Sequence, residues 1–122
     1  GKETDPHPLF IRWSRKFSAE YDAAALTPGS KYAFAFPLML KGESTEGWKE
    51  VVTLKVVLPD GQDYPTTTVD PNDIPLNSDK NFQSGVFAVT KSEGKITLNV
   101  ITEQGRNLKS ALVVGDIGLV PH

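Results

Sequence analysis

The feature that most constrains this chain is the regular alternation of large apolar residues with smaller or polar ones over residues 31–40. The large apolar side chains occupy every second position, at Tyr32, Phe34, Phe36, Leu38 and Leu40. In an extended strand these side chains all point to one side, whereas a helix would distribute them around its axis. The run therefore predicts a core strand. Pro37 lies within it and has no backbone donor, so we expect it at an edge, at a bulge, or where its missing amide would face away from the ladder.

The same two-residue period recurs along most of the chain. It predicts further strands in residues 9–17, 48–58, 62–69, 86–90, 96–101, 108–114 and 117–120. Pro59-Asp60-Gly61 predicts a chain reversal, and the polar residues 91–94 predict the turn of a second hairpin, between 86–90 and 96–101. Residues 18–26 fit either a short helical turn or an extended segment. The fold class that follows is all-β: a two-sheet antiparallel β-sandwich, jelly-roll or immunoglobulin-like, of about eight strands.

Length and charge limit the classes of partner. A chain of 122 residues is a common size for one domain, and we expect a flexible N-terminal tether at 1–8 and a single sandwich domain at 9–122. The net charge of -2 gives no field that attracts nucleic acid. No apolar run approaches the roughly 20 residues of a transmembrane segment. The polar, proline-bearing lead-in suggests a trimmed terminus, so we expect an upstream signal or lipid anchor and an extracytoplasmic location.

Two segments resemble a known family. Leu26-Thr27-Pro28-Gly29-Ser30-Lys31-Tyr32-Ala33-Phe34 is similar to the loop-to-strand entry of jelly-roll carbohydrate-binding modules and of fibronectin type III domains, where the tyrosine hydroxyl bonds back to the loop backbone. Its position in the first third of the chain favours the jelly-roll comparison. Gly115-Asp116-Ile117-Gly118-Leu119-Val120-Pro121 resembles the closing strand of such modules. The resemblance implies a non-catalytic module that recognises glycan.

Such modules usually stack exposed aromatic rings on sugars, and this chain offers few candidates. Trp48 follows Gly47 at a loop-to-strand junction, and Tyr64 follows the Asp60-Gly61 turn. Either ring could instead cap the core, and Trp13 alternates with core positions. Asp73 and Asn77 add hydrogen-bonding groups from a long loop predicted at 70–81, because this segment is rich in proline, aspartate and asparagine. The predicted ligand-binding residues are therefore Trp48, Tyr64, Asp73 and Asn77.

Few residues of the sequence suit metal binding or catalysis. Calcium binds several oxygen ligands from a flexible turn, and the long loop carries five oxygen-bearing side chains within ten residues. They are Asp70, Asn72, Asp73, Asn77 and Asp79. Their spacing matches no calcium loop, so we expect a solvated loop and no cofactor. The two histidines, at positions 7 and 122, are poorly placed for catalysis, and we expect no enzyme. The alternative is a structural or adhesion module that binds another protein; a small hydrolase would require paired acids in a cleft.

Overall fold

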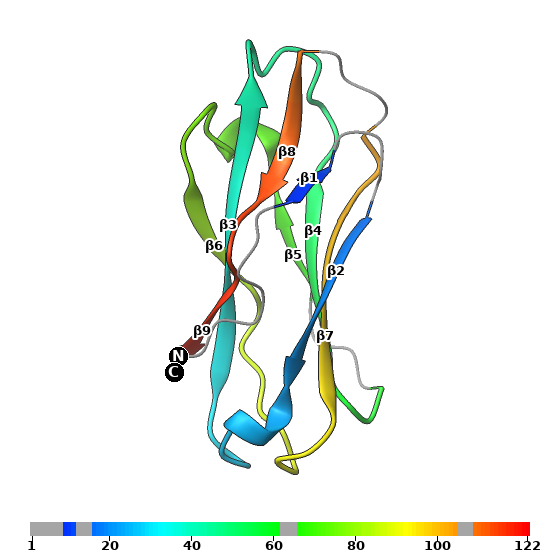
Figure 1. The fold of residues 1–122 in the computed structure, drawn as a ribbon, viewed down its shortest axis with the longest axis vertical. Coiled ribbons are helices and arrows are strands. Elements are labelled where there is room, and N and C mark those ends of the chain that lie inside the picture. The colour runs from blue at the N-terminus through cyan, green and yellow to red at the C-terminus, as the bar shows by residue number, and fades with distance from the viewer. Residues whose placement is uncertain (1–8, 12–15, 62–65, 105–108) are drawn as a thin grey trace.

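The structure, a computed structural model, describes residues 9–11, 16–61, 66–104 and 109–122, with the backbone alone at 9–11 and 16. These residues form nine strands and two short 3-10 helices: β1 (Leu9–Ile11), β2 (Lys16–Asp22), η1 (Ala23–Ala25), β3 (Tyr32–Gly42), β4 (Val52–Val57), β5 (Thr67–Val69), η2 (Pro71–Asp73), β6 (Lys80–Gln83), β7 (Lys95–Thr102), β8 (Ser110–Val114) and β9 (Gly118–Pro121). The strands make two antiparallel layers, as Figure 1 shows. The predicted β-sandwich is confirmed.

The strand order is that of a jelly roll. One sheet runs β1-β8-β3-β6, with β9 also paired to β3, and the other runs β2-β7-β4-β5. The pairs β1·β8, β2·β7, β3·β6 and β4·β5 are all antiparallel, so the first eight strands form one long hairpin. The β3·β8 and β4·β7 pairs then wrap this hairpin into two sheets. Of the two predicted sandwich types, this order selects the jelly roll.

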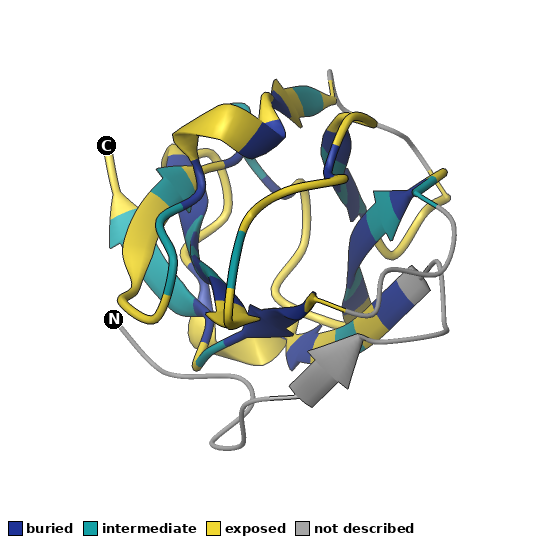
Figure 2. Ribbon diagram, turned by 90° about the horizontal axis from the view of Figure 1, so that it is seen from above, coloured by how far each residue is buried: buried dark blue, intermediate teal, exposed yellow. Residues whose placement is uncertain are grey.

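The core lies between the sheets and is built by the alternation seen in the sequence. Phe34, Phe36 and Leu38 of β3 are completely buried, and Leu54 of β4 faces them across the interior. Seen from one end, the strands of both layers carry buried stretches, whereas the connecting loops are mostly exposed (Figure 2). Near the start of β3, Phe34 stacks on Phe87 with 5.4 Å between ring centroids and meets Tyr21 edge-on at 5.2 Å. Such aromatic pairs stabilise a core beyond their buried area.

Two local predictions are confirmed by hydrogen bonds. Thr27 N–H donates to the Tyr32 hydroxyl at 2.9 Å, so the ring is buried while its oxygen holds the preceding loop. Gly61 N–H donates to Leu58 O at 2.8 Å and closes the predicted reversal, with Gly61 at a φ of 84°. Residues 18–26, left open by the sequence, continue β2 and then form η1.

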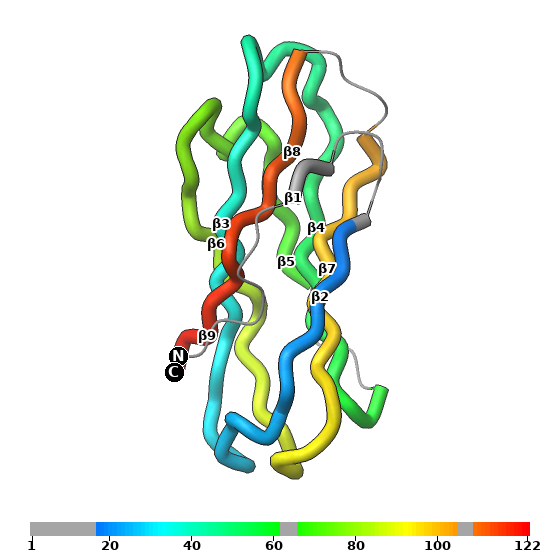
Figure 3. The backbone as a smooth tube through the Cα atoms, viewed as in Figure 1, coloured from blue at the N-terminus to red at the C-terminus, as the bar shows by residue number. Residues whose placement is uncertain are grey.

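Pro37 lies in the central strand β3, opposite the break between β8 and β9. These two strands follow one another along β3, as the tube in Figure 3 shows, and Gly115 between them donates its N–H to Pro37 O at 2.9 Å. A Cβ on Gly115 would lie 3.1 Å from the Pro37 ring, so glycine allows this close approach. The proline is tolerated at an interruption of the ladder, as predicted.

The second predicted hairpin is wrong. Residues 86–90 do not form a strand beside 96–101; instead, residues 84–89 follow β6 along the start of β3. Ser84 N–H donates to Phe34 O, Phe87 and Tyr32 exchange two backbone bonds, and Gly29 N–H donates to Val89 O. Alternation identified the apolar residues but could not choose their partner strand. The predicted loop at 70–81 is also shorter than expected, because β6 begins at Lys80.

Candidate functional site

Of the two alternatives for Trp48, an exposed ring or a cap on the core, the structure has the cap. Trp48 is 8% exposed, and its Nε1 donates to the Ser110 hydroxyl at 2.9 Å. The loop that carries it is held by Gln104, whose Oε1 accepts from the Lys49 and Glu50 N–H groups and whose Nε2 donates to Gly47 O. Trp48 therefore closes one end of the core and presents no free ring face for sugar stacking.

Asn77 lies at the same end and is also committed to the chain. Its Oδ1 accepts from Gly42 N–H at 3.0 Å and its Nδ2 donates to Gly42 O at 2.9 Å. Both polar atoms of the amide thus hold the long loop to the end of β3. Asn77 has a φ of 59°, a left-handed conformation that asparagine tolerates better than most residues. These two bonds fix the orientation of the amide, and its role as a ligand residue stays a prediction.

Of the other two predicted ligand residues, Asp73 is described by the structure and Tyr64 is not. Asp73 ends η2 at the surface of the same upper end (Figure 1). Tyr64 lies outside the described residues, so its role stays a prediction. Asp70 caps η2 by accepting from Asn72 N–H at 2.9 Å. Among the described residues, no three histidine, cysteine, aspartate or glutamate side chains come together as a metal site.

The described residues form a pocket at the opposite end of the sandwich. The pocket has a volume of about 250 Å³ and lies between the turn after β4 and the segment that leads into β7. Its apolar residues are Leu58, Pro59, Ala88 and Val89, and its polar residues are Asp60, Thr90, Lys91 and Glu93. Leu58 and Val89 are buried, at 5% and 3% exposed, whereas the four polar residues are exposed. The pocket therefore combines apolar surface with a polar rim, the usual composition of a small-molecule site.

Backbone hydrogen bonds hold the wall formed by residues 88–93. Val89 O accepts from Gly29 N–H at 3.0 Å, and just beyond the wall Gly94 O accepts from Ala23 N–H at 2.9 Å. The Ser92 hydroxyl adds a bond to Leu26 O at 2.6 Å. A Cβ placed on Gly94 would lie 2.7 Å from Pro59 Cβ, so the two walls approach each other closely at this point. A pocket fixed in this way requires little ordering when a ligand binds.

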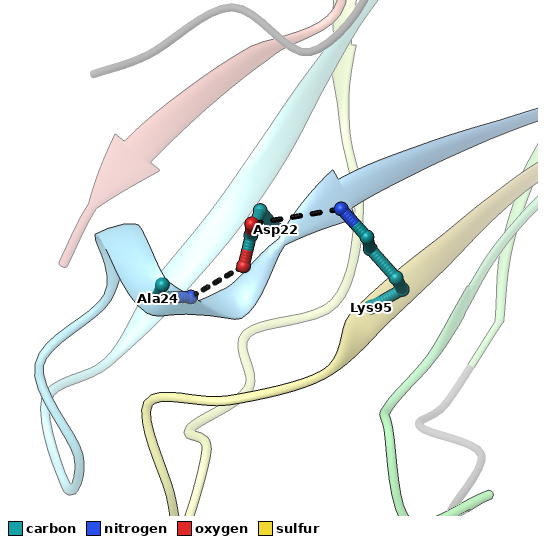
Figure 4. Close-up of polar contacts among 3 residues, drawn as sticks. All are labelled: Asp22, Ala24 and Lys95. Carbon is teal, nitrogen blue, oxygen red and sulfur yellow. Dashed lines mark hydrogen bonds and ion pairs between the residues drawn. The ribbon is translucent and has the colours of Figure 1, made fainter.

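Two exposed ion pairs set the charge at this end. Lys91 Nζ lies 4.0 Å from Glu93 Oε1 on the rim, and Lys95 Nζ lies 3.5 Å from Asp22 Oδ2 (Figure 4). The Ala24 N–H, which donates to Asp22 Oδ1, and then the Lys95 charge hold the pKa of Asp22 below its usual value of 3.8. Both lysines thus already have a carboxylate partner, while Asp60 adds another acid to the pocket.

Sequence reasoning found both turns of this pocket but not their contact. Pro59-Asp60-Gly61 and Lys91-Ser92-Glu93-Gly94 each predicted a reversal, and in each an acid directly precedes a glycine. The two segments are about thirty residues apart, and nothing in either sequence identifies the other as its neighbour. The glycines are consistent with the left-handed φ of 84° at Gly61 and 89° at Gly94, but they do not indicate that the two turns meet.

No family model and no curated protein matches the sequence. Solved structures do match: one described as CBM4 aligns with 98% of this chain at 13% identity and a TM-score of 0.53, and this chain spans 64% of its length. The EclA C-terminal domain, described as a sugar-binding protein, aligns with 94% of this chain and 78% of its own length, at 12% identity and a TM-score of 0.54.

These matches agree with the strand order. The chain has the fold of jelly-roll carbohydrate-binding modules. The same jelly roll occurs elsewhere: a structure of infectious bursal disease virus, Gt strain, aligns with 98% of this chain and 30% of its own, at 12% identity and a TM-score of 0.56. Since the identities are this low, the likeness is one of fold, and function depends on the residues of the site. Within the described ranges, no helix is long and apolar enough to cross a membrane.

Proposed function

We propose that this chain is a non-catalytic, extracytoplasmic binding module that recognises glycan at the pocket between residues 58–60 and 88–93. The observation that carries the proposal is the composition of this pocket. Pro59 and Ala88 supply apolar surface for the C–H groups of a sugar ring, and the carboxylates of Asp60 and Glu93 accept hydrogen bonds from its hydroxyls. The shared fold with sugar-binding modules supports the same function.

The direct test is a glycan array followed by calorimetry on the best ligand. We expect Asp60→Asn to weaken binding about tenfold, because a hydrogen bond to a charged acceptor contributes more than one to a neutral amide. The matched control is Asp73→Asn, which makes the same change in another exposed aspartate at the opposite end of the sandwich. Equal losses in both variants, or no sugar bound by the wild type, would contradict the proposed site. Tyr64→Ala belongs in the same series, since Tyr64 is still proposed as a ligand residue.

A protein-binding module is the second proposal, and one observation favours it. Three positions of β3 that alternate with its core residues are apolar and half-buried: Ala35, Pro37 and Met39. On the same side, Val120 of β9 lies opposite Ala33 and is also half-buried. An apolar outer surface on a sheet is typical of protein contacts. Met39→Lys separates the two roles, because it should abolish binding to a protein partner and leave binding to the sugar identified on the array unchanged.

A further inference from the structure

The pocket is small compared with sites that enclose whole ligands. At about 250 Å³ it falls below the roughly 300–1,000 Å³ of typical drug-sized sites. This volume suits one sugar ring rather than a run of rings. A ring inside a glycan chain has neighbours on two sides, and both must leave the pocket, whereas a terminal ring has one neighbour. The size therefore favours the end of a chain.

The charges of the lining indicate which terminal sugar fits. Among the described lining residues, Asp60 and Glu93 are acidic and Lys91 is basic. The Lys91 ammonium already lies beside Glu93. A sugar carboxylate would therefore meet two acids, and its one cationic partner is shared with one of them. Like charges brought together at a binding site oppose the complex, whereas uncharged hydroxyls donate readily to carboxylates.

The rigid walls support the same choice. The segment 88–93 is held by hydrogen bonds from Gly29 N–H and to Leu26 O, and the close approach of Gly94 to Pro59 sets the spacing of the walls. Widening the pocket would separate Gly94 from Pro59, so this contact favours a ligand that fits the present spacing of the walls. We propose that it receives a single uncharged sugar residue at the end of a glycan chain. This inference rests on the proposed glycan-binding function and specifies its ligand.

Chain length provides the first test. Nuclear magnetic resonance titrations of the whole chain would use the methyl glycosides of glucose, galactose, mannose and N-acetylglucosamine, then linear di- and tetrasaccharides of the sugar that binds. We expect the amide signals of residues 58–61 and 88–93 to shift, and the affinity to change less than about threefold from one ring to four. A rise of about tenfold or more with each added ring would overturn the chain-end inference while leaving glycan binding intact.

Charge provides the second test. The uncharged methyl glycoside that binds is compared with the uronic acid of the same sugar, which differs only at C6. We expect the uronic acid to bind at least about tenfold more weakly to the wild type, and Glu93→Lys to reduce or reverse this preference. The matched control is Glu46→Lys, because Glu46 is equally exposed and lies 3.4 Å from Lys109 Nζ, as Glu93 lies near Lys91. A uronic acid that binds more tightly to the wild type would overturn the inference.

Different results would contradict glycan binding at the pocket and the preference for a terminal neutral sugar. If none of these sugars shifts the signals of residues 58–61 and 88–93, the proposed function itself is wrong. If sugars bind there but prefer internal segments or carry a negative charge, glycan binding holds and the inference about the terminal neutral residue is wrong.

Discussion

The two ends of this sandwich use their loop side chains differently. Backbone bonds join loops at both ends, as at Leu40 at the upper end of Figure 1 and at Gly29 at the lower end. At the upper end, long amide side chains add bonds to the backbone of other loops: the Asn77 amide holds the end of β3, and the Gln104 amide holds residues 47–50. Beside the pocket at the lower end, the Ser92 hydroxyl adds a bond to backbone, whereas the polar residues of the rim are exposed.

Three of the four predicted ligand residues, Trp48, Asp73 and Asn77, lie at the end opposite the pocket. The Asn77 amide uses one acceptor site and one donor hydrogen on the chain, and these two bonds fix its orientation. On the rim of the pocket, the side chains of Thr90 and Glu93 stay at the surface. A polar loop residue is therefore a stronger ligand candidate when its side chain does not hold the loop itself.

The largest expected effect is a loss of stability at the upper end without a loss of sugar affinity. Trp48→Ala removes a buried ring and leaves Ser110 without its donor, so we expect the free energy of unfolding to fall by about 3–5 kcal/mol. Urea denaturation measures this loss. Sugar affinity, measured on the folded variant at low temperature, should not change, because the ring lies far from the pocket. A parallel loss of affinity would show that the two ends are coupled.

The next effect concerns the spacing of the pocket walls. Gly94→Ala adds a Cβ that collides with Pro59 and is strained at a φ of 89°, so we expect a loss of about 1–3 kcal/mol in stability together with weaker sugar binding. Gly29→Ala is the control, because Gly29 has a similar φ of 82° and open space around its Cβ position. It should show the backbone strain without the loss of affinity. Calorimetry measures the sugar affinity of both variants. Similar affinities would contradict the proposal that the spacing of the pocket walls controls binding.

A smaller effect is expected where Asn77 holds the upper loop. Asn77→Gly keeps the positive φ without strain and removes two hydrogen bonds to Gly42, so stability should fall by about 1–2 kcal/mol. Amide hydrogen exchange of residues 71–79 should become faster, while that of residues 88–93 should not. Asp73→Ala, in the same loop, should change stability by less than about 0.5 kcal/mol. If sugar binding is lost in Asn77→Gly, the upper end contributes to the site after all.

The smallest effect is a pH dependence at the lower end. The pKa of Asp22 is lowered by the Ala24 N–H and by Lys95, so the folded state binds this proton less readily than the unfolded state does. Its contribution to stability is present above pH 3.8 and is lost as the pH falls through the lower folded pKa. Asp22→Asn should therefore be less stable than the wild type at neutral pH, and the difference should close in strong acid. Urea denaturation across this range, at low salt because the pair is exposed, measures it. A difference that grows in acid would contradict the assignment.

Local pattern determined the parts of the fold that depend on one segment. The alternation at Tyr32 to Leu40 identified the central strand, because the side-chain period of an extended chain is fixed by its geometry. The Tyr32 hydroxyl bond and the turn at Gly61 also follow from residues within a few positions of one another. These features need no information from the rest of the molecule.

Tertiary structure decided everything that depends on which segments meet. The apolar residues at 86–90 were recognised, but only the fold shows that Phe87 pairs with Tyr32 of β3 instead of with β7. The sequence around Trp48 fitted either an exposed ring or a cap on the core, and only the fold shows that the ring is buried and donates to Ser110, sixty-two residues away. The pocket likewise exists because the turn after β4 meets the segment before Gly94. A sequence specifies local geometry directly, whereas the choice among equally apolar or equally polar partners is made by packing of the whole chain.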